Sequence, residues 1–163
     1  MFAVVGAAAP DGDDLLLASL VFGDDGEVVN TYAKKHPHGQ ERELFRAGEK
    51  PTLVDVDGWA LGMAICRDAA LPEHAAEVFG AGADVYVVSA LYEAGTERRR
   101  DDHLRARSAD HGGWAVLATH GDETGGYRTT GGSGVWDPAG RLVAQAGAGV
   151  PDLAVATLHP GTV

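Results

Sequence analysis

Apolar residues recur along the chain in short runs with the length and composition of β-strands. Residues 15–22 (LLLASLVF) and 27–32 (EVVNTY) are two such runs, separated by the glycine-containing segment GDDG. Two β-type runs joined by a short turn predict an antiparallel hairpin. Residues 52–56 and 59–65 flank an Asp-Gly turn and predict a second pair of strands.

The middle of the chain carries two segments with helical features. Residues 72–80 begin with a proline, which suits the first turn of a helix, and glycines end the segment. Residues 97–111 are rich in Arg and Asp, have only a narrow apolar face and stop at a Gly-Gly pair. Residues 84–90 and 114–119 each follow one of these helices and predict buried strands.

Three further short runs, residues 131–136, 141–146 and 153–158, predict strands towards the end of the chain. An Asp-Pro-Ala-Gly turn joins the first two of them as a hairpin. Strands that alternate with helices, with hairpins on both sides, predict an α/β domain whose mixed sheet is covered by helices.

Two segments lack a clear strand or helix pattern. Residues 6–12 consist mainly of small residues and predict a glycine-rich turn before the first hairpin. Residues 36–50 are polar and interrupted by glycine and proline, and they predict a loop or short helix anchored by Leu44 and Phe45.

Length and charge restrict the class of protein. The 163 residues fit one domain, spanning 1–163. Acidic residues outnumber basic ones by 24 to 13, and the resulting charge of −11 opposes both a nucleic-acid backbone and an anionic membrane surface. No apolar stretch approaches the ~20 residues of a membrane helix, and no signal peptide is recognisable. We therefore expect a cytoplasmic protein without a nucleic-acid or membrane partner.

The single cysteine, Cys66, follows the predicted strand at 59–65 and precedes a polar turn and a helix. One thiol cannot form an internal disulfide, and without a second thiol we assign no metal and no cofactor. The end of a strand is where α/β sheets place ligands and nucleophiles, so Cys66 is a candidate nucleophile. The competing interpretation is a small buried hydrophobe, the usual state of a free cysteine.

A second group of candidates follows the strand at 27–32. Lys34, Lys35 and His36 come directly after it, and Glu41 lies in the next loop. A lysine beside a carboxylate and near a thiol can stabilise both a thiolate and the oxyanion formed after attack. Taken singly, these residues also fit a solvated strand end and a surface turn with local ion pairs.

Six sequence blocks carry a resemblance when taken together and in order. They are NTYAKKH (30–36), GQERELFRAG (39–48), GMAICRDAALPE (62–73), GAD (82–84), RARSA (105–109) and GSGVWDPAG (132–140). This series resembles the carbon–nitrogen hydrolase, or nitrilase, superfamily. The resemblance implies a nitrilase-like α-β-β-α sandwich with mixed sheets.

The resemblance also implies roles for individual residues. Cys66 matches the family's nucleophile, Lys34 its catalytic lysine, and Glu41 the second glutamate, which orients the lysine. The backbone N–H of Arg67, directly after the nucleophile, would meet the oxyanion. Tyr92 falls in a loop where the family often presents an aromatic residue to the substrate.

The implied reaction is hydrolysis of a non-peptide carbon–nitrogen bond through a cysteine thioester, which releases ammonia or an amine and a carboxylic acid. An amide is favoured over a nitrile as the small-molecule substrate. Transfer of the acyl group to an acceptor other than water uses the same residues. A homodimer is implied by the resemblance alone.

The family's first glutamate, its general base, has no match in the printed chain. Residues 1–6 resemble the family's later strand that leads into the hairpin, so the first strands and first helix are expected to be missing. Pro10 and Asp11 lie in the predicted glycine-rich turn and offer no substitute. Either the sequence starts at an internal methionine or the protein is a truncated relative with doubtful activity. The alternative function is therefore an inactive nitrilase-like module retained for binding or assembly.

Overall fold

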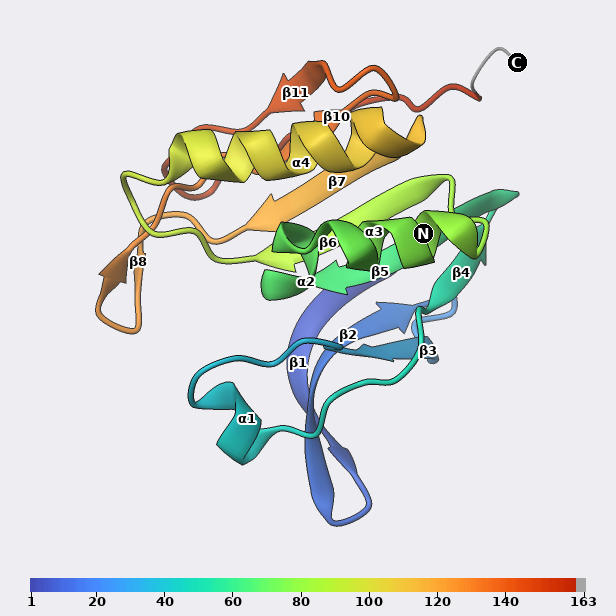
Figure 1. Ribbon diagram of the computed structural model, residues 1–163, viewed down its shortest axis with the longest axis vertical. Helices are drawn as coiled ribbons and strands as arrows, with labels where there is room; N and C mark the ends of the chain where they lie inside the picture. Colours follow the sequence, from blue (N-terminus) through green and yellow to red (C-terminus); the bar gives the residue numbers. More distant parts are fainter. Residues whose placement is uncertain (161–163) are drawn as a thin grey trace.

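A six-stranded mixed sheet forms the centre of the computed structural model, which describes residues 1–160 (Figure 1). Its strands, in spatial order, are β11 (Leu142–Gln145), β10 (Gly134–Trp136), β7 (Trp114–Thr119), β6 (Val85–Ala90), β5 (Trp59–Ile65) and β4 (Leu53–Val56). The central strands β5, β6 and β7 are parallel, and the outer ones are antiparallel to their neighbours. The sheet is thus mixed, as the alternation of hairpins and helices predicts.

A three-stranded antiparallel sheet packs on one face of the central sheet. It consists of β1 (Ala3–Asp11), β2 (Asp14–Phe22) and β3 (Val28–Ala33) in sequential order. Val21 and Tyr32 are fully buried and share an apolar cluster with Val54, Met63 and Ile65 of the central sheet. This contact brings the end of β3 close to the end of β5.

Helices α3 (Pro72–Gly80) and α4 (Glu97–His111) cover the opposite face of the central sheet (Figure 1). They connect the parallel strands, since such strands need a crossover. Helix α4 ends at Gly112, whose φ of 64° is the left-handed conformation common after a helix. Two single-turn helices, α1 (Glu41–Leu44) and α2 (Arg67–Ala70), lie beside the strand ends that carry the candidate residues.

Two sequence predictions are wrong. Residues 6–12 do not form a glycine-rich turn, because β1 continues to Asp11, which pairs with Asp14 across a two-residue turn. Cross-strand pairing along the whole length of β2 outweighs the low strand propensity of the small residues. Asp11 is therefore the last residue of a strand.

Residues 153–158 do not form a strand, since they pair with no other strand in the described part of the chain. The alternating pattern reflects packing instead. Ala156 and Leu158 lie against the cluster that contains Trp114, while Leu153 and Val155 are exposed. The indole N–H of Trp114 donates to the carbonyl of His159 at 3.2 Å.

Two elements were not predicted at all: the single turn α2, and a small hairpin of β8 (Glu123–Thr124) and β9 (Tyr127–Arg128). None of the helices within residues 1–160 has the length and hydropathy needed to cross a bilayer.

Candidate active site

Cys66 occupies a strained turn between β5 and α2. Its φ of 49° and ψ of −102° fall in a region that residues with a side chain rarely adopt. The backbone N–H of Cys66 donates to the carbonyl of Ser89 on β6 at 2.7 Å, and its own carbonyl accepts from Ala69. This sharp change of direction leaves the side chain half-buried at the end of the strand.

Lys34 forms a buried ion pair at the end of β3. Only 1% of its side chain is exposed, and its ammonium group donates to both carboxylate oxygens of Glu41, at 2.8 and 2.7 Å. Burial alone would raise the pKa of Glu41. The hydrogen bonds from Lys34 and from the backbone N–H of His38, together with the charge of Lys34, outweigh burial and hold that pKa below its usual range. Glu41 is thus a carboxylate at neutral pH.

A cavity of about 660 Å³ connects these groups. Its lining residues are His38, Glu41, Cys66, Arg67, Ala70, Leu91, Tyr92, Glu93, Arg99, His103 and Tyr127. They come from α1 and α2 with the residues just before each, from the loop after β6, from α4 and from β9 (Tyr127), so the cavity lies where five segments meet at the ends of parallel strands. A thiol and a carboxylate that holds a buried ammonium group therefore face the same space.

A match to a family model decides how this arrangement is interpreted. Residues 1–163 match the model described as "Carbon-nitrogen hydrolase". The chain belongs to the carbon–nitrogen hydrolase family. The resemblance inferred from the six sequence blocks is thereby confirmed, and with it the α/β fold class of the nitrilase superfamily.

Relatives within the carbon–nitrogen hydrolase family are amidases and hydrolases. The Omega-amidase NIT3 of Saccharomyces cerevisiae is 28% identical over 165 residues, which is 94% of this chain and 56% of the yeast protein. A hydrolase encoded in the pqqF 5′ region of Pseudomonas protegens is 32% identical over 75% of this chain and 44% of its own length. The chain thus spans about half the length of these relatives.

A solved amidase structure from the same family aligns over nearly the whole chain. The amidase from Nesterenkonia sp. AN1 has a TM-score of 0.88 and 27% identity, and covers 97% of this chain and 63% of its own. The crystal structure of Saccharomyces cerevisiae Nit3 has a TM-score of 0.82 over 94% of this chain and 57% of its own. The two sheets and their helical layer are therefore the arrangement of nitrilase-superfamily amidases.

The structure brings four of the five candidate residues to one cavity and joins the fifth to it. Cys66, Glu41, Arg67 and Tyr92 line the cavity, and Lys34, which is not among the lining residues, forms its ion pair with Glu41. Burial raises the pKa of Tyr92 to about 12, so its hydroxyl keeps its proton near neutral pH.

Sequence analysis missed the contribution of helix α4 to the cavity. Arg99 and His103, four residues apart and hence on one helical face, line it together with Tyr127 of β9. Burial and the charges of Arg107 and Arg99 lower the pKa of His103, which keeps its imidazole neutral at neutral pH. The four-residue spacing of Arg99 and His103 was the available signal. Because α4 contains many charged residues, this spacing alone did not distinguish the pair.

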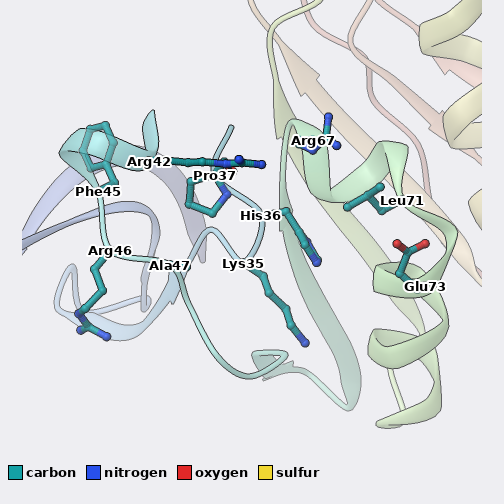
Figure 2. Close-up of a pocket in the computed structure, with 10 residues that line it drawn as sticks. All are labelled: Lys35, His36, Pro37, Arg42, Phe45, Arg46, Ala47, Arg67, Leu71 and Glu73. Carbon is teal, nitrogen blue, oxygen red and sulfur yellow. Dashed lines mark hydrogen bonds between the residues drawn. The ribbon is translucent and has the colours of Figure 1, made fainter. Parts of the chain in front are cut away.

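Arg67 also borders a second cleft of about 650 Å³, shown in Figure 2. The segment around α1 forms one side, with Arg42 and Phe45, and α2 with the start of α3 forms the other. Lys35, which lines this cleft, forms an ion pair with Glu77. None of the residues that line this cleft is a cysteine, serine or threonine, so the candidate site is the cavity beside Cys66.

Two histidines in the segment before α1 contact carboxylates. His36 Nδ1 lies 2.9 Å from Asp68 Oδ1, and His38 Nδ1 lies 3.3 Å from Glu41 Oε2. Within residues 1–160 no group of three or more His, Cys, Asp and Glu side chains is arranged to hold a metal ion.

Proposed function

We propose that this chain hydrolyses the carbon–nitrogen bond of a small amide with Cys66 as the nucleophile. One observation carries the proposal: Cys66, in its strained turn, lines the same cavity as Glu41, which holds the ammonium group of Lys34. The relative from Nesterenkonia, whose structure includes acrylamide added at its active site cysteine, supports it.

In the first step the sulfur of Cys66 forms a bond to the carbonyl carbon, and the carbonyl electron pair moves to oxygen. An ammonium group has three N–H donors, and Glu41 accepts two from Lys34, which leaves one for the oxyanion. The backbone N–H of Arg67 is the second donor. Both donors stabilise charge that develops only during the reaction.

Collapse of the adduct breaks the carbon–nitrogen bond, and the thiol proton leaves with the nitrogen as ammonia or an amine. Water then attacks the thioester, the carbon–sulfur bond breaks, and a proton returns to sulfur. The sum is one amide and one water converted to one carboxylic acid and one amine. The resemblance assigns proton transfer to a glutamate that precedes these segments in the family, so Glu41 keeps its role of orienting Lys34.

Two guanidinium groups of the cavity favour an amide that carries a carboxylate. Arg67 and Arg99 line it, and neither guanidinium forms an ion pair with any residue in the range 1–160. Guanidinium groups bind carboxylates strongly, often through two parallel hydrogen bonds. Relatives named omega-amidases occur in yeast, Arabidopsis thaliana and Danio rerio. A monoamide of a short dicarboxylic acid is therefore the substrate class we propose, with Tyr92 on the wall beside it.

The test is ammonia release from succinamic acid and from butyramide, two amides of equal chain length that differ by a carboxylate in place of a methyl group. The protein is purified from its native source and its intact mass is measured, because a mass above 16.9 kDa identifies segments beyond the printed chain. We expect hydrolysis of succinamic acid that Cys66→Ala abolishes. Undiminished hydrolysis by Cys66→Ala would overturn the role of Cys66.

Two alternatives are outcomes of the same assay. A hydroxamate formed on addition of hydroxylamine would indicate transfer of the acyl group to an acceptor other than water. No ammonia from either amide, with Cys66 alkylated by iodoacetamide no faster than a free thiol, would favour a non-catalytic module for binding or assembly. The homodimer implied by the resemblance stays a prediction, and light scattering of the purified protein tests it.

A further inference from the structure

Asp68 is a fully buried carboxylate that accepts hydrogen bonds from three residues at the ends of two strands. Its Oδ2 accepts from the hydroxyl of Tyr32 at 2.7 Å and from the backbone N–H of Ile65 at 3.0 Å. Its Oδ1 accepts from the backbone N–H of His36 and from His36 Nδ1, both at 2.9 Å. One side chain on α2 thus joins the end of β3 to the end of β5.

These partners flank the two residues proposed to do the chemistry. Tyr32 and His36 stand two positions before and after Lys34, so the chain is tied to Asp68 on both sides of the lysine. Ile65 directly precedes Cys66. A displacement of the Asp68 carboxylate would therefore move the lysine and the cysteine relative to each other.

A second layer of buried groups fixes Tyr32 itself. Burial lowers the pKa of His74 and keeps its imidazole neutral. Since the Tyr32 hydroxyl donates to Asp68, His74 Nε2 donates to Tyr32 at 2.9 Å, and His74 Nδ1 accepts from the Tyr86 hydroxyl at 2.8 Å. The donors all point the same way, from Tyr86 through His74 and Tyr32 to Asp68, and such aligned bonds strengthen one another.

We infer that Asp68 is a positioning residue. It fixes the separation of Lys34 and Cys66 through its hydrogen bonds with Tyr32, His36 and Ile65. This inference rests on the proposed function, because it concerns the same nucleophile and the same oxyanion donor. Asp68 contacts no substrate in the proposed reaction. It acts only by fixing the separation of two groups, and a misplacement of about 1 Å can cost on the order of 10²-fold in rate.

Two tyrosine variants give a matched test. Tyr32 and Tyr86 are both fully buried and both donate a hydroxyl hydrogen bond, but only Tyr32 touches Asp68. We expect Tyr32→Phe to lower kcat for succinamic acid about 10–100-fold with KM changed less than about threefold. Tyr86→Phe removes a hydrogen bond that is further from Asp68 in the same chain, so it should lower kcat less than about threefold while lowering the melting temperature about as much as Tyr32→Phe does.

Asp68→Asn provides a second variant of the same size, in which one acceptor oxygen becomes a donor group. Folding is checked by circular dichroism, and if Asp68→Asn does not fold, Tyr32→Phe decides. A kcat for folded Tyr32→Phe equal to that of Tyr86→Phe would overturn the inference, because the role of Asp68 would then be structural only.

Failure of the proposed function is distinguishable from failure of this inference. If the unmodified protein releases no ammonia, the alkylation rate of Cys66 by iodoacetamide, followed by mass spectrometry, replaces turnover as the readout. We expect Tyr32→Phe and Asp68→Asn to change that rate at least threefold relative to Tyr86→Phe. Equal rates in all three variants would overturn the positioning role whatever the reaction is.

Discussion

The ammonium group of Lys34 donates to both oxygens of Glu41 in a site where the lysine is almost completely buried. Removing the charge of Glu41 leaves a buried ammonium without its counter-ion, which is costly. We expect Glu41→Gln to lower the free energy of unfolding by about 1.5–3 kcal/mol at pH 7, the range for hydrogen bonds to charged groups. Urea unfolding measures this change.

The ion pair between Lys34 and Glu41 predicts that the stability of the fold changes with pH in a defined direction. The pKa of Glu41 is lower in the folded state than its ordinary value of 4.5. Its contribution is therefore complete above that ordinary pKa and is lost as the pH falls through the lower folded value. The stability difference between the unmodified protein and Glu41→Gln should shrink below pH 4.5. Glu43→Gln, at an exposed position on α1, is the control and should show no such change. A stability difference between the unmodified protein and Glu41→Gln that stays constant with pH would contradict the prediction.

The backbone of Cys66 predicts an unusual order of stability for two substitutions. At a φ of 49° and a ψ of −102°, glycine relieves strain that alanine retains, and such strain costs about 1–3 kcal/mol. We expect Cys66→Gly to be at least as stable as Cys66→Ala in thermal unfolding. Ala64→Gly, two positions earlier in β5, should show the ordinary loss of stability on introducing glycine. A lower melting temperature for Cys66→Gly than for Cys66→Ala would argue against backbone strain at Cys66.

Gly62 lets helix α3 approach β5, the strand that directly precedes Cys66. A Cβ at Gly62 would overlap with Cγ1 of Val78 on α3. Overpacking of this kind costs about 1–3 kcal/mol, so Gly62→Ala should lower the urea midpoint, and Val78→Ala in the same chain should restore part of the loss. Gly80→Ala meets open space and serves as the control. Additive effects of the two substitutions would mean that the helix does not contact β5 as described.

Arg99 predicts a change in substrate preference. Replacing it with methionine removes a cation from the cavity while keeping an unbranched apolar stem. We expect Arg99→Met to lower the ratio of kcat/KM for succinamic acid over butyramide about 10–100-fold, since a hydrogen bond to a charged group contributes about 1.5–3 kcal/mol. Arg98→Met is the control, because Arg98 is exposed and pairs only with Asp102 among the residues described. An unchanged ratio would remove Arg99 from substrate binding.

The strands and helices that the sequence predicts well are those with a local signal. Helix α4 and strand β7 begin and end at the predicted residues because glycines at 112 and 113 separate them. The ordered sequence blocks likewise predict that Lys34, Glu41 and Cys66 belong to one site. A short stretch of chain determines the ends of this helix and strand by itself, whereas the grouping of the three residues was implied by the resemblance to a family.

The parts that could not be predicted depend on contacts between distant segments. Arg100 and Arg107 are buried because they donate to the carbonyls of Gly131 and Ala69, which no hydrophobic pattern reveals. The hydrogen-bond network around Asp68 requires Tyr32 and His74, which meet only after the two sheets and α3 have packed. Residues 153–158 have the alternation of a strand, but a strand also requires a neighbour to pair with.

The hydrogen bond from the Cys66 N–H to the carbonyl of Ser89 carries a consequence for synthesis. Parallel pairing of β5 with β6 requires the whole of α3 to have left the ribosome, since α3 is the crossover between them. Until then Cys66 belongs to a nascent chain without its neighbouring strand and without a turn to strain it. The strained backbone conformation of Cys66 is therefore completed only after β6 has been synthesised, so the geometry of this turn depends on a segment that follows it in the chain.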